Sequence, residues 1–115
     1  MKHYKKLLEN LLTQNGWRVE QINSHASWWI EESWNIRSIE KNWGKALVIA
    51  FLRHFYSESA SEKDYPPVYK ITANLEMPVN SENDGLPFAF MRLDTGNFHR
   101  ALADFMAEIN QFREH

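Results

Sequence analysis

Apolar residues recur at the helical spacing of three and four positions in two segments of the chain. The first segment carries Tyr4, Leu7, Leu8, Leu11 and Leu12, and the second carries Phe98, Ala101, Leu102, Phe105, Met106, Ile109 and Phe112. Asn15-Gly16 follows the first segment, and such a pair commonly ends a helix. Asp94 and Thr95 precede the second segment and can accept the free amides of a helix start. The pattern predicts two amphipathic helices, each with one apolar stripe.

Between these segments the apolar period shortens to two residues, which is typical of β-strands. Strands are predicted at residues 17–22, 28–39, 45–56 and 68–77. Residues 87–93 fit either a fifth strand or a loop that covers the sheet. An amphipathic helix must bury its stripe, so both helices are expected on the same face of the sheet. We therefore predict an α+β fold in a single domain, residues 1–115, with a four-stranded antiparallel meander flanked by the two helices.

The apolar sides of the second and third strands can be matched, which sets their register. This register pairs Trp34 with Ile49, Ile36 with Leu47, Phe51 with Glu32 and Arg53 with Ile30. Strict alternation along the second strand turns Trp28 and Ile30 toward the helices. It also turns Glu31 and Glu32 to opposite faces, so these two carboxylates are not expected to meet.

The sheet face that points away from the helices carries more apolar side chains than a solvated face normally does. The candidate interface residues on this face are Trp29, Glu31, Leu52, His54, Tyr56 and Thr72. One interpretation is a homodimer or another protein partner bound to this face. The other is coverage by the chain itself, particularly by residues 79–93.

Glu32 and Arg53 become diagonal neighbours on the face that the helices cover, where an isolated charge would be costly. They are candidate pocket residues, placed to bind a small charged ligand in a small-molecule-binding protein or an enzyme. The alternative is a structural ion pair near the margin of the sheet.

Composition narrows the possible partners. Thirteen Lys and Arg against fifteen Asp and Glu give a formal charge of −2 without a basic block, so no nucleic-acid partner is expected. The longest apolar run, residues 46–52, is far shorter than the roughly 20 residues that span a membrane, so no membrane contact is expected. The absence of cysteine excludes disulfides and thiolate sites, and it is compatible with the cytoplasm.

Candidate catalytic and metal-binding residues form no motif in this sequence. The five histidines lack the short spacings that place two ligands on one face, so neither a metal nor another cofactor is expected. The four glycines are too dispersed for a phosphate-binding loop. A serine triad could combine Ser33 and His54 with a distant acid, but any serine-rich chain offers such a set. The leading hypothesis is therefore a cytoplasmic protein-binding or adaptor module that acts as a homodimer.

Overall fold

The computed structural model describes residues 3–25, 29–40, 44–53, 67–77, 87–93 and 96–114. The elements are α1 (Tyr4–Gln14), β1 (Trp17–Ser24), β2 (Ile30–Ser38), β3 (Ala46–Arg53), β4 (Val68–Asn74), β5 (Ala89–Arg92) and α2 (Phe98–Arg113). The predicted α+β class is confirmed. Over the described residues the sheet has five strands instead of four, because part of segment 87–93 pairs with β4 as β5.

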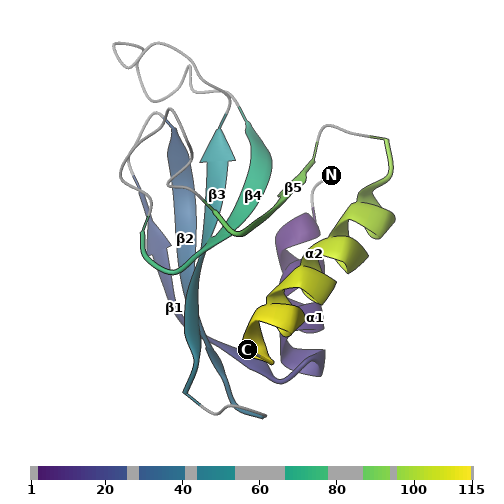
Figure 1. Ribbon diagram of the computed structural model, residues 1–115. Helices are drawn as coiled ribbons and strands as arrows, with labels where there is room; N and C mark the ends of the chain where they lie inside the picture. Colours follow the sequence, from purple (N-terminus) through teal and green to yellow (C-terminus); the bar gives the residue numbers. More distant parts are fainter. Residues whose placement is uncertain are drawn as a thin grey trace.

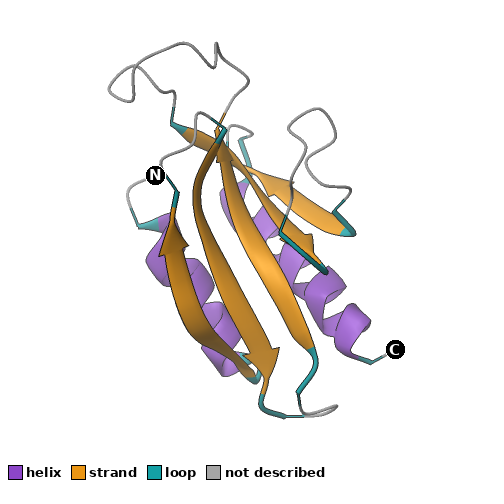
Figure 2. Cartoon of the chain, turned by 90° about the vertical axis from the view of Figure 1, so that its left-hand side faces the viewer, coloured by secondary structure: helices purple, strands orange, loops and turns teal. Residues whose placement is uncertain are grey.

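The strands form an antiparallel meander in the order β1-β2-β3-β4-β5. Both helices lie on one face of this sheet, as predicted (Figure 1). In Figure 2 the sheet stands in front of the two helices, so its other face, here called the outer face, is turned to the viewer. Leu8 and Leu12 of α1 and Phe105 and Ile109 of α2 are buried against the helix-side face. Each such side chain contributes about 1.5–3 kcal/mol of stability.

Local signals set the limits of the helices. Gly16 follows α1 with a positive φ of 79°, and Ile39 N donates to its carbonyl oxygen at 2.8 Å. A positive φ favours glycine, which is consistent with the predicted end of the helix. The cap of α2 is Asn97, whose Oδ1 accepts a hydrogen bond from Arg100 N at 3.4 Å. The cap is therefore not one of the two predicted residues, Asp94 and Thr95, which lie outside the described residues.

A chain of hydrogen bonds, here called the asparagine clasp, joins α2 to β1 and to the end of α1. The buried Trp17 donates from Nε1 to Oδ1 of Asn110 at 3.0 Å. Asn110 in turn donates from Nδ2 to Oδ1 of Asn15 at 2.9 Å. The clasp satisfies the polar atom of a core tryptophan, which would otherwise be costly to bury.

The predicted register of β2 and β3 holds over most of their length. Trp34 pairs with Ile49, Ile36 pairs with Leu47, and Glu32 pairs with Phe51. The prediction is wrong at one end, because a β-bulge between Ile30 and Glu32 pairs Ile30 with Leu52 instead of Arg53. A bulge adds one residue to one strand and so reverses the alternation beyond it.

The bulge moves Ile30 to the outer face. There it forms a small apolar cluster with Ala50 and Leu52, and Trp29 and Met77 pack against this cluster. The chain therefore covers this part of the outer face with Met77, just before the predicted covering segment 79–93. Within that segment, residues 89–92 belong to the sheet as β5 instead of lying over it.

Candidate functional site

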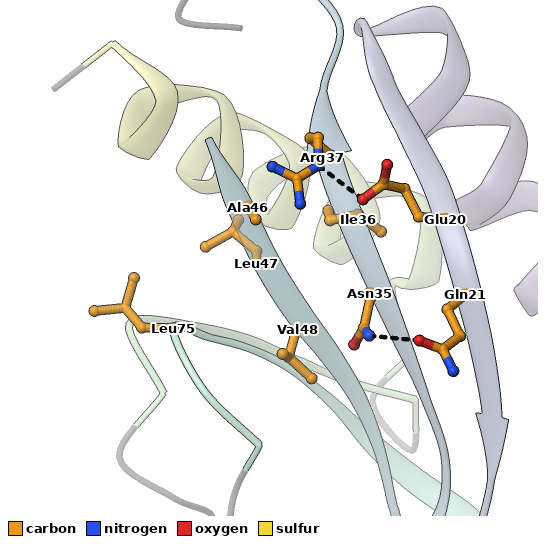
Figure 3. Close-up of a pocket in the computed structure, with 9 residues that line it drawn as sticks. All are labelled: Glu20, Gln21, Asn35, Ile36, Arg37, Ala46, Leu47, Val48 and Leu75. Atoms are coloured by element: carbon orange, nitrogen blue, oxygen red, sulfur yellow. Dashed lines mark hydrogen bonds and ion pairs between the residues drawn. The ribbon is translucent and has the colours of Figure 1, made fainter. Parts of the chain in front are cut away.

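An open hollow of about 470 Å³ lies on the outer face, over β1, β2 and β3 (Figure 3). It is lined by Glu20, Gln21, Ile36, Asn35, Arg37, Ala46, Leu47, Val48 and Leu75. This volume falls within the usual range of ligand pockets, about 300–1,000 Å³. The hollow is the candidate functional site.

A second β-bulge explains why two successive residues of β1 line the hollow. The register of β1 against β2 shifts between Val19 and Gln21, so Glu20 has no direct partner on β2. Without the bulge, alternation would turn Glu20 and Gln21 to opposite faces of the sheet. Both residues line the hollow instead.

One side of the hollow carries ion pairs. Arg37 donates from Nε to Oε1 of Glu20 at 2.8 Å and from Nη1 to the carbonyl oxygen of Gly44 at 2.9 Å. Arg18 donates from Nη2 to Oε2 of Glu20 at 3.0 Å. The hydrogen bonds from Arg37 and Arg18 hold the pKa of the Glu20 carboxyl below its usual value. Glu20 is therefore ionised at neutral pH, and this side of the hollow presents both signs of charge.

A pair of amides lies beside these charges. Asn35 donates from Nδ2 to Oε1 of Gln21 at 3.2 Å. The described residues give no further hydrogen bond to Asn35 Oδ1 or to Gln21 Nε2. The pair therefore offers one acceptor and one donor to whatever enters the hollow.

The other side of the hollow is apolar. Val48 is half-buried on β3, and Leu75, which directly follows β4, is 66% exposed. Figure 3 shows Val48 between Leu75 and Asn35. Sequence reasoning missed Leu75 because it continued the alternation of the fourth strand to residue 77 and turned this residue toward the helices. The strand ends at Asn74, and Leu75 instead lines the outer face.

The predicted interface residues that the structure describes do not form an exposed patch. Leu52 and Thr72 are 1% and 0% exposed, so the chain itself buries them and they offer a partner no contact area. Trp29 is half-buried against the small apolar cluster. Glu31 contacts α1, as described below. His54 and Tyr56 lie outside the described residues.

The predicted pocket residues belong to an ionic cluster between α1 and the sheet. Lys5 Nζ contacts an oxygen of Glu31 and lies 3.3 Å from Oε1 of Glu32. Arg53 Nη2 lies 3.8 Å from Oε2 of Glu31. The bulge at Ile30 thus brings the two carboxylates together, so the prediction that they could not meet is wrong. Two cations meet two anions here, and the cluster connects α1 to β2 and β3.

Tyr4 lies next to this cluster. Its ring is 6.2 Å from that of Phe51, measured between centroids. Burial raises the pKa of the Tyr4 hydroxyl above its ordinary value, and the negative charges of Glu31 and Glu32 raise it further. The hydroxyl is therefore neutral over the physiological pH range.

Ser33 and His25 are the pair that most resembles a catalytic arrangement. His25 Nε2 lies 2.9 Å from Ser33 Oγ, a distance at which a histidine could take a proton from serine. Ser33 is fully buried, however, and a nucleophile must reach its substrate. We assign this contact to the structure of the sheet, where it satisfies a buried hydroxyl.

The described residues include neither a metal-binding cluster nor a membrane-spanning helix. These residues contain no group of three histidine or acidic side chains that could hold a metal ion. No helix in the same part of the chain is long and apolar enough to cross a membrane.

Comparison of the chain with protein-family models, with curated proteins and with solved structures finds no match.

Proposed function

We propose that this chain is a cytoplasmic protein-binding module that acts as a homodimer through the outer face of its sheet, centred on the hollow. The observation that carries the proposal is the position of Leu75, a large apolar side chain that stands 66% exposed at the hollow. A single exposed leucine is ordinary on a protein surface. Leu75, however, projects beside the hollow, so this surface combines a projecting apolar group with a concave, partly apolar area.

A second copy of the chain is the occupant that this surface fits. In a two-fold dimer the same surface meets itself, so it must be complementary to itself in shape and in charge. Arg18 and Arg37 lie beside Glu20, so both signs of charge occur at the hollow. An arginine of one copy can then face the glutamate of the other, which a surface of one sign would not allow.

The proposal is tested by the solution mass, measured by light scattering for the native chain and for Leu75→Glu. We expect a native dimer and a folded monomer for the variant, because a buried charge without a partner opposes association. Ile22→Glu is the matched control, because Ile22 is also largely exposed, at 52%, and does not line the hollow. It should remain dimeric. A native monomer over the micromolar range, or dissociation by the control alone, would reject the proposal.

A further inference from the structure

We infer that Asn15-Gly16 is a site of spontaneous deamidation, and that the asparagine clasp holds Asn15 in an unreactive position. This is the only Asn-Gly pair in the sequence. A glycine after an asparagine favours the reaction, because it has no side chain to hinder its own backbone nitrogen and its backbone rotates freely. The helices that the clasp joins lie on the other face of the sheet from the hollow, so this site is independent of the proposed dimer (Figure 1).

The reaction joins the backbone nitrogen of Gly16 to the side-chain amide of Asn15. Water or hydroxide takes the proton from Gly16 N, which then bonds to Cγ of Asn15. The bond from Cγ to Nδ2 breaks, and Nδ2 takes a proton from water and leaves as ammonia. The product is a cyclic imide, which a second water molecule opens to aspartate or to isoaspartate. Water is therefore the only reagent consumed.

Hydrogen bonds engage both reacting groups in the folded chain. Asn15 donates from Nδ2 to the carbonyl oxygen of Leu11 at 2.7 Å, and its Oδ1 accepts from Nδ2 of Asn110 at 2.9 Å. The buried Gly16 N donates to the carbonyl oxygen of Thr13 at 3.1 Å. Attack requires the side chain of Asn15 to leave its two bonds and Gly16 N to leave its own. The reaction therefore proceeds through a locally open state, and its rate follows the population of that state.

The reaction would also weaken the end of α1. An aspartate at position 15 has no Nδ2, so the carbonyl oxygen of Leu11 loses its side-chain donor and faces a carboxylate instead. The new negative charge lies at the C-terminal end of α1, where the helix dipole is already negative. Isoaspartate adds a carbon to the backbone at the same point. Deamidation therefore loosens the clasp that had prevented it.

The test is the rate at which aspartate and isoaspartate form at position 15, measured by peptide mass spectrometry during incubation at mildly alkaline pH. The folded native chain should react more slowly than the same chain unfolded in urea. Asn110→Ala removes the donor to Asn15 Oδ1, so it should react about fivefold faster than the folded native chain, the factor that corresponds to about 1 kcal/mol for one hydrogen bond. Leu52→Ala is the matched control, because Leu52 is buried in the outer-face cluster, away from the clasp. It should react at the native rate while it is folded.

Three results would overturn the inference. They are equal rates in the folded and unfolded native chain, no product at position 15 even in urea, and equal acceleration in Leu52→Ala and Asn110→Ala. The last result would mean that the rate follows overall stability and not the clasp. If Asn110→Ala does not fold, Asn110→Asp gives the second measurement, since its carboxylate still accepts from Trp17 Nε1 but has no proton to donate to Asn15. It should also react faster than the native chain, and an unchanged rate would overturn the role of the clasp.

Discussion

Lys5 of α1 contacts Glu31 of β2, although strict alternation along β2 would turn Glu31 toward the outer face. The bulge at Ile30 is the cause, and it places both Glu31 and Glu32 within reach of one ammonium group. The β-bulge thus positions the two carboxylates whose contacts with Lys5 connect α1 to the sheet. Removal of the cation should therefore weaken that connection.

We predict that Lys5→Met lowers the free energy of unfolding and that the loss depends on Glu31. A double-mutant cycle with Glu31→Gln should give a coupling of about 0.5–1 kcal/mol, the range of partly exposed ion pairs. Lys6→Met is the control, because Lys6 is exposed in the same turn and shares the unfavourable interaction of a cation with the helix N-terminus. Urea unfolding measures all four variants. Equal losses for the two lysine variants would contradict the prediction.

The raised pKa of Tyr4 predicts that the folded chain loses stability in alkaline solution. Its pKa is raised in the folded chain, so the neutral hydroxyl is favoured by folding. The resulting stability is fully present below the pKa of the unfolded chain, which is about 10, and it declines as the pH rises above that value. Tyr4→Phe cannot ionise, so its unfolding free energy should fall less between pH 8 and pH 11. Equal falls for the variant and the native chain would show that Tyr4 does not cause the effect.

Leu52 and Leu75 contribute to the outer face in different ways, and their alanine variants should differ accordingly. Leu52 is buried, so Leu52→Ala should cost about 2–5 kcal/mol. Leu75→Ala should change the stability of the isolated chain by less than about 0.5 kcal/mol, because its side chain is exposed. The measurement is urea unfolding at a concentration at which both variants are monomers. A small loss for Leu52→Ala would mean that this side chain is available to a partner after all.

Gly16 and Gly44 form a matched pair of backbone positions. Both have a positive φ, which costs an alanine about 1–2 kcal/mol. A Cβ at Gly16 would also lie 2.9 Å from the Cβ of Glu40, whereas a Cβ at Gly44 meets nothing within 4 Å. Gly16→Ala should therefore be the more destabilising of the two in thermal unfolding. Equal shifts of Tm would indicate that Glu40 moves aside at no cost.

The pairing of Trp34 with Ile49 could be predicted from the sequence, because both strands bury one apolar side and a slip of one residue would expose it. The two helices could also be predicted, because each carries a single apolar stripe that has to be buried. The bulges at Ile30 and Glu20 could not be predicted in this way. A bulge changes the count of residues on one strand, and Ile30 is apolar and fits either face.

The hollow could not be predicted either, because it depends on where the chain goes after β4. The alternation of apolar residues continues through Leu75 and Met77, as it would in a longer strand. The chain instead leaves the sheet after Asn74, with Leu75 lining the hollow and Met77 packed against the cluster of Ile30, Ala50 and Leu52. Asn35, Arg37 and Val48 follow the simple alternation of their strands, but they line a concave site only because Leu75 lies beside them on the outer face.

The asparagine clasp has a consequence for the order in which the chain assembles during synthesis. Trp17 and Asn15 are separated from Asn110 by 93 and 95 positions. Ribosomes add about 5–20 residues per second, so the first strands are available for several seconds before Asn110 is made. The pairing of β1 with β2 and of β2 with β3 needs only neighbouring segments and can form in that interval. Trp17 must wait for α2, and until then its ring and indole N–H are open to water or to a chaperone.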